Sequence, residues 1–255
     1  MPAPQTDGPQ TDGPQTDGPQ TDGPQADGPQ TDGPQSDGLV DDVLQAVKPR
    51  LRGWLHAGTF PLSVVAGIAL VLLADGPRDT AATAVYATSA ALLFGVSAIY
   101  HRGNWSPRRE RLLKRLDHSN IFLIIAGTYT PFSVILLDRR GGVLLLWIVW
   151  SAALAGIAFR VLWVGAPRWL FTPVYIALGW VAVFYLGDIL EAGGPAVVAL
   201  LAIGGVLYSL GGVVYALKRP NPSPRWFGFH EVFHALTLGA YVTHYIALAL
   251  ATYRA

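Results

Sequence analysis

The residues of this sequence that most directly suggest chemistry are two histidines four positions apart, His230 and His234. Residues at positions i and i+4 share one face of a helix, so the two imidazoles can hold a single metal ion. The chain has no cysteine, so any further ligand must be histidine, a carboxylate or water. Zinc with three histidine ligands and a fourth position for water is a familiar catalytic arrangement.

Three more polar residues belong to the same candidate site: His101, Asp117 and Ser97, the last of which precedes His101 by one helical turn. Histidine and aspartate inside a membrane are costly unless they are paired, so they mark functional sites by default. We predict that His101 joins the His230/His234 pair as the third zinc ligand. Asp117 would then hydrogen-bond the zinc-bound water or a ligand imidazole.

The elements that must position these residues are long and apolar. The chain has 255 residues, of which 51% are hydrophobic and 14% charged, whereas about a quarter of the residues of a soluble domain are charged. A membrane-spanning helix needs ~20 mostly apolar residues. We predict an all-α fold, a seven-helix transmembrane bundle over residues 55–252, with spans at 56–74, 80–101, 118–137, 142–163, 169–187, 195–217 and 230–252.

The orientation of the bundle follows from the positions of lysine and arginine, which favour cytoplasmic loops. With the N-terminus inside, the inner segments hold fourteen basic residues and the outer segments four. The N-terminus is therefore predicted to be cytoplasmic and the C-terminus outside. This orientation brings His101, Asp117, His230 and His234 to one depth, at the cytoplasmic end of the bundle.

The region before the bundle differs in composition. Residues 4–38 repeat the pentapeptide Pro-Gln-Thr-Asp-Gly with two variants, which predicts a disordered acidic tail over residues 1–38. Residues 39–54 show apolar positions at helical spacing and predict a short amphipathic juxtamembrane segment. The net charge of +1 says nothing by itself about nucleic acid, and no nucleic-acid partner is expected. The expected partner is the lipid bilayer of the cell membrane, and a homo-oligomer is left open.

Other histidines and one glutamate have simpler interpretations. His56, His118 and His244 are expected to be polar residues at the level of the lipid headgroups. The sequence HEVFH at residues 230–234 also matches the H-E-x-x-H pattern of zinc proteases, in which the glutamate is the general base. We instead expect Glu231 to be a solvated residue at the start of a helix, where a carboxylate is favoured by the dipole.

Four motifs together resemble the hemolysin III branch of the progestin and adipoQ receptor family: SAIYH at 97–101, LDHS at 116–119, AGTYTPF at 126–132 and HEVFH at 230–234. The resemblance covers roughly residues 50–252. It implies a zinc site in which His101, His230 and His234 are the ligands. Asp117, which contacts zinc through water, and Ser97 would support them. Members do not all keep glutamate at the second position of the last motif, which weakens the protease interpretation.

Two classes of function remain open from the sequence. One is zinc-dependent hydrolysis of a lipid amide or ester that enters from the bilayer, as the resemblance of adiponectin receptors to ceramidases implies. In the other, a structural zinc ties two helices together and the protein senses or adjusts the state of the membrane. A membrane-lytic pore is a third reading, implied by the family name. It is poorly supported because no predicted helix has a broad polar stripe.

Overall fold

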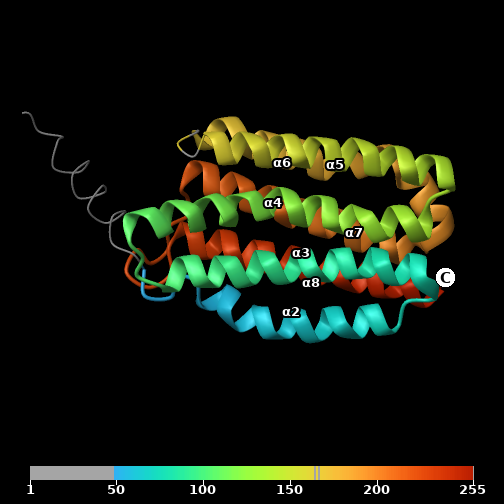
Figure 1. Cartoon of the computed structure of the whole chain (residues 1–255), viewed down its shortest axis with the longest axis horizontal. Helices are drawn as coiled ribbons and strands as arrows, with labels where there is room; N and C mark the ends of the chain where they lie inside the picture. Colours follow the sequence, from blue (N-terminus) through green and yellow to red (C-terminus); the bar gives the residue numbers. More distant parts are fainter. Residues whose placement is uncertain (1–48, 164, 166, 255) are drawn as a thin grey trace, which may run out of the picture. The chain divides into compact units, whose positions relative to one another are not determined.

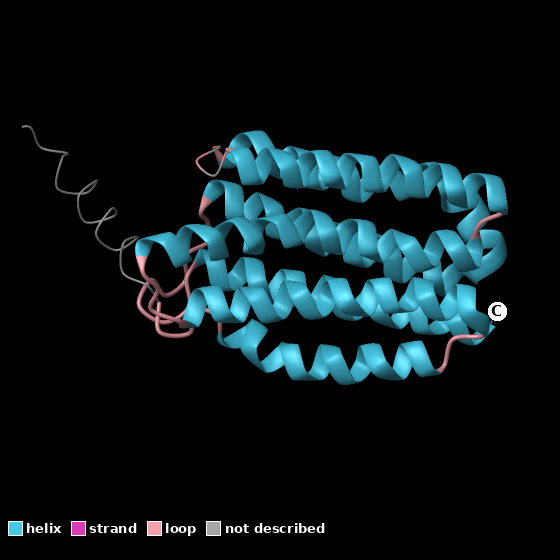
Figure 2. Cartoon of the chain, viewed as in Figure 1, coloured by secondary structure: helices cyan, strands magenta, loops and turns pink. Residues whose placement is uncertain are grey.

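The computed structural model describes residues 49–163, 165 and 167–254. The predicted acidic tail, residues 1–38, and residues 39–48 of the predicted amphipathic segment lie outside the described residues. The described part is helical, and apart from one isolated bridge between Ser223 and Phe227 it contains no β-structure (Figures 1 and 2). The elements are α2 (Trp54–Leu72), α3 (Gly76–Arg102), α4 (Pro107–Leu136), α5 (Arg139–Leu162), α6 (Arg168–Gly179), the 3₁₀ helix η1 (Trp180–Tyr185), α7 (Leu186–Leu217) and α8 (Phe229–Arg254).

Among the described residues, six helical stretches are long and apolar enough to cross a membrane. The fifth, Trp169–Leu217, has 49 residues and holds two of the predicted spans, 169–187 and 195–217. Its helical backbone is interrupted at Gly194, where φ is 78° and ψ is 173°, a conformation that suits glycine. Gly212 of α7 lies against Thr172 and Ile176 of α6. The chain therefore turns back on itself within this stretch.

One predicted boundary was clearly wrong. The third long helix, α4, begins at Pro107 rather than near residue 118. Proline is favoured in the first turn of a helix, and the arginines, lysine and glutamate that follow are good helix formers, so the polar segment continues the helix instead of forming a loop. Pro61 and Pro131 lie within α2 and α4, and both helices continue past them.

The burial pattern is that of a bundle surrounded by lipid. α4 is the central helix of the bundle. In its most apolar 18-residue stretch, 67% is buried inside the protein, compared with at most 44% in the other long helices. The outer helices expose large apolar side chains, as expected where the neighbouring solvent is hydrocarbon. Examples are Leu72, Leu162 and Phe184. α2 packs on both α3 and α8, whose polar ends carry the candidate site.

Candidate metal centre

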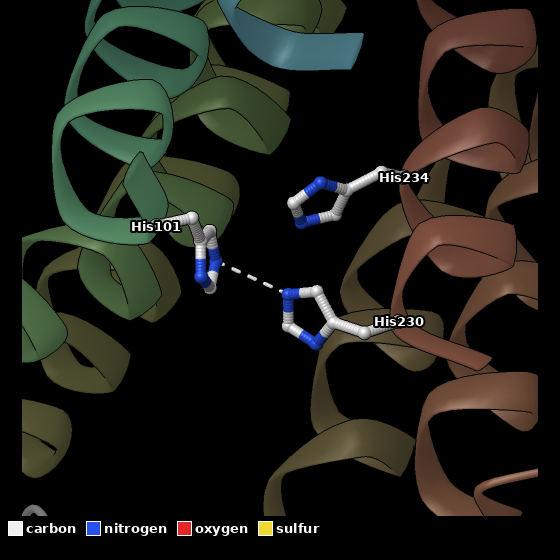
Figure 3. A group of neighbouring side chains, drawn as sticks. All are labelled: His101, His230 and His234. Atoms are coloured by element: carbon white, nitrogen blue, oxygen red, sulfur yellow. Dashed lines mark hydrogen bonds between the residues drawn. The ribbon is translucent and has the colours of Figure 1, made fainter. Parts of the chain in front are cut away.

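Three histidines from the two helices α3 and α8 form one cluster (Figure 3). His101 lies in the last turn of α3, and His230 and His234 lie in the first turns of α8. One ring nitrogen from each comes within 4.8 Å of the others. The Nε2 atoms of His101 and His230 are 3.1 Å apart, close to the roughly 3.3 Å that separates two nitrogen ligands of a tetrahedral zinc ion. The donor set and its spacing therefore fit zinc.

The cluster is largely shielded from solvent. His101 is 6% exposed and His234 is 2% exposed, whereas His230 is partly exposed. The ring centroids of His230 and His234 are 4.5 Å apart, as expected for two residues on the same helical face. Three imidazoles in so small a volume compete for hydrogen-bond donors, and a shared cation satisfies all three as acceptors.

Asp117 and Ser97 lie beside the cluster, as the sequence predicted. Asp117 Oδ2 is 3.8 Å from His101 Nε2, which is too long for a hydrogen bond but suits a bridging water. Ser97 is buried, and its hydroxyl is within hydrogen-bonding reach of the Asp117 carboxylate. The carboxylate is thus held at a fixed place next to the candidate ligands.

The expectation that His118 and His244 are headgroup-level residues was wrong for both. His244 lies in the middle of α8 and packs against Gly204 of α7, and His118 is buried. Because α4 extends outward to Pro107, this position lies inside the bundle. Its Nδ1 pairs with the Lys114 carbonyl at 2.8 Å and its Nε2 with the Tyr215 hydroxyl at 3.2 Å. Far from the cluster, His244 Nε2 pairs with the Leu201 carbonyl at 3.2 Å.

His56 is a residue of the site that sequence reasoning missed. It is 2% exposed, not interfacial, and its ring stacks on His234 with a centroid distance of 3.8 Å and an interplanar angle of 7°. A signal was present, because His56 opens the first predicted span on the same side as the zinc-ligand candidates. That signal is weak on its own, because a lone histidine at a helix end is usually only a polar anchor.

Glu231 is not solvated, contrary to expectation, since it is 1% exposed. One carboxylate oxygen accepts a hydrogen bond from the Gly228 N–H at 2.8 Å, and the other accepts one from Arg52 Nε. Glu231 is buried because the residues that precede α2 fold over the start of α8, and one of them, Arg52, supplies the guanidinium that pairs with it. With both oxygens engaged, Glu231 is poorly placed to act as a protease-like general base.

A cavity of about 200 Å³ opens from the cluster into the bundle. Asp117, His230 and His234 line one end, and Ser133 and Leu137 line the other. Asp117 and Leu137, the residue that follows α4, are separated by ~30 Å at 1.5 Å per residue. Between them the walls are mostly apolar, with Ile121, Ile125 and Phe132 from α4 and Ile176, Ile189 and Leu201 from the neighbouring helices.

Long apolar helices with a shielded histidine cluster at one end of the bundle define a multi-pass integral membrane protein. The chain belongs to the haemolysin-III related family, whose model matches residues 44–245. It is 34% identical to "Hemolysin-3" of Bacillus cereus over 199 residues, covering 76% of this chain and 88% of that protein. It is 33% identical to the "Hemolysin-3 homolog" of Bacillus subtilis (strain 168) over 182 residues, covering 70% and 82%.

A more distant relative extends the comparison to animals. The chain is 23% identical to the human "Monocyte to macrophage differentiation factor" over 208 residues, covering 79% of this chain and 83% of that protein. These matches confirm the predicted membership of the hemolysin III branch of the progestin and adipoQ receptor family. The protein is accordingly a multi-pass protein of the cell membrane.

Proposed function

We propose that this protein acts in membrane homeostasis by zinc-dependent hydrolysis of a lipid amide or ester. The observation that carries the proposal is the apolar cavity that ends at Asp117, His230 and His234. A chain-like apolar ligand in this cavity would bring its polar end to the histidine cluster, where a carbonyl can be attacked. A site intended only to hold helices together needs no such cavity.

In the proposed centre, His101, His230 and His234 hold the metal through ring nitrogens. Zinc, when bound, lowers the pKa of its water toward ~7 and polarises a carbonyl. Asp117 takes the proton from the attacking water and delivers it to the leaving amine or alkoxide. Ser97 fixes the carboxylate by hydrogen bonding, and the cavity wall excludes bulk water from the reacting carbonyl.

We also propose seven crossings, with the N-terminus in the cytoplasm and the C-terminus outside. A 49-residue stretch is ~74 Å long as a helix, more than twice the ~30 Å hydrocarbon core. The turn at Gly194 and the packing of α7 on α6 support two crossings by this stretch. The fourteen-to-four distribution of basic residues supports the orientation.

A second candidate function is a membrane sensor with a structural metal. The positions of the proposed ligands favour it. They lie on α3 and α8, so a bound metal would hold together two helices that are far apart in the sequence. A water-filled pore is less well supported, since the cavity wall is mainly apolar. The name "Hemolysin-3" belongs to the Bacillus cereus relative and is not by itself evidence for a pore in this protein.

The deciding experiment combines metal analysis with lipid turnover. Purified protein with bound zinc is incubated in mixed micelles with a panel of ceramides, acyl amides and acyl esters, and released fatty acid is measured by mass spectrometry. Hydrolysis that disappears on chelation and returns with zinc supports the proposal. Zinc-loaded protein that leaves the whole panel intact would favour the structural role.

A further inference from the structure

The residues that lead into α2, 49–53, form a segment of turns that we call the α2 leader. It pairs with the loop before α8: the Arg50 N–H donates to the Arg225 carbonyl at 3.0 Å, and the Leu51 N–H donates to the Trp226 carbonyl at 3.2 Å. The Arg50 guanidinium also lies 4.7 Å from the centre of the Trp226 ring. The leader is thus attached to the segment that delivers the two helix-α8 histidines.

Arg52 extends this attachment to the start of α8. Its Nε donates to Glu231, whose other oxygen accepts the Gly228 N–H. A glutamate in the first turn that bonds back to the residue before the helix is one half of a capping box, and it fixes where the helix begins. His230 precedes Glu231, so the same contacts set the direction of that imidazole.

The leader and the first turn of α2 also touch the other two histidines. Gly53 has φ 78°, and a Cβ atom placed there would lie 2.8 Å from His101 Cβ. One turn later, His56 stacks on His234 at 3.8 Å. Neither ring nitrogen of His56 has a hydrogen-bond partner in the described part of the chain, so this imidazole makes contact through its face and edge. In Figure 3 the blue start of α2 lies between the green α3 and the red α8.

We propose that Arg52 and His56 are positioning residues that set the geometry of the three-histidine centre. Arg52 acts through Glu231 on the start of α8, and His56 acts through its ring face on His234. The same short stretch also contacts α3, through Gly53 beside His101 and through the edge of the His56 ring on Phe94. The inference rests on the proposed metal centre, and it adds the residues that hold the three histidine ligands in position.

Zinc affinity measures this role without any activity assay. Full-length protein in detergent is titrated with zinc against a chromophoric chelator, and the absorption spectrum of the cobalt(II) form reports the ligand set. Arg52→Gln, Glu231→Ala and His56→Ala are each expected to weaken zinc binding by ~10–100-fold, the usual effect of losing a residue that orients a ligand. The exposed Glu110→Gln change removes a charge from nearby α4 and serves as the control.

Conservative changes separate positioning from ligation and from general misfolding. His56→Phe keeps a flat ring but no nitrogen, and it should restore near wild-type affinity and the wild-type cobalt spectrum. Arg52→Lys keeps the charge and should recover part of the loss. If His56→Phe loses zinc as completely as His56→Ala and alters the spectrum, then His56 is a ligand and the proposal is overturned. Unchanged affinity in all three disruptive variants would also overturn it, whereas wild-type protein that binds no zinc would refute the metal centre itself.

Discussion

The Nε2 atoms of His101 and His230 lie 3.1 Å apart, although 129 positions separate the two residues in the chain. Each belongs to the polar end of an apolar helix. Two imidazoles at this distance share either a proton or a cation, and the third imidazole of His234 within 4.8 Å favours the cation. The predictions below depend on this arrangement.

The double change His230→Ala with His234→Ala should abolish zinc binding. Wild-type protein is expected to hold about one zinc ion per chain, and the variant none, because two of three proposed nitrogen ligands are gone. Elemental analysis of purified protein measures both. His244→Ala is the matched control, since it removes a histidine from the same helix away from the cluster. Full zinc content in the double variant would refute the site.

Asp117→Asn should leave most of the zinc in place and remove hydrolysis. The amide keeps the shape of the side chain but has lost the charge that accepts a proton from water. Metal content and fatty-acid release are measured on the same preparation. If the zinc is structural, this variant will be metal-loaded and show no defect. If the site is empty, Asp117 is itself a ligand and the three-histidine model is wrong.

Gly53→Ala should destabilise the protein and weaken zinc binding. A residue other than glycine in the left-handed region costs ~1–3 kcal/mol, and the new methyl group would press on the Cβ of His101. The melting temperature in detergent and the zinc titration should therefore fall together. Gly58→Ala is the control, because no atom lies within 4 Å of its added Cβ. Equal melting temperatures for the two variants would contradict the described backbone.

The two chain termini should report opposite sides of the membrane. Reporter fusions that are active only in the cytoplasm should work at residue 1 and fail at residue 255, because basic residues concentrate in the predicted inner segments. A periplasmic or extracellular reporter should show the converse pattern. Termini on one side would mean that the stretch Trp169–Leu217 does not cross twice.

Deletion of residues 1–38 should leave membrane insertion and zinc content unchanged. The repeat carries almost no apolar surface, so it cannot contribute to a folded core by burial. Membrane fractionation and elemental analysis compare the truncated and full-length chains. Loss of zinc after the deletion would assign the tail a role in the metal site.

Much of the fold could be predicted because lipid imposes a simple rule on composition. Long apolar stretches must be helical to satisfy their backbone groups. The helical character was confirmed for the described residues, with six stretches long and apolar enough to cross a membrane. The early start of α4 at Pro107 was missed because a polar segment carries no apolar periodicity, although its charged residues favour a helix. The number of crossings stays a prediction.

The candidate site was predictable where residue type and depth agreed. The clustering of His101, His230 and His234 is confirmed by their geometry, and zinc binding stays a prediction. His56 and Glu231 were misjudged because their environments depend on tertiary contacts, namely a ring stack and an arginine 179 positions away. Periodicity within one helix contains no information about such partners.

The ligands' separation along the chain has a consequence for biosynthesis. His101 is inserted with α3, but His230 and His234 enter the membrane only with α8, the last helix of the described residues. A metal held by all three histidines could therefore bind only after α8 has been made, and a ribosome that stalls before α8 releases a chain without the complete cluster. Occupancy of the proposed site would thus distinguish chains that contain α8 from shorter ones, and removal of the ion would loosen α3 and α8 from each other.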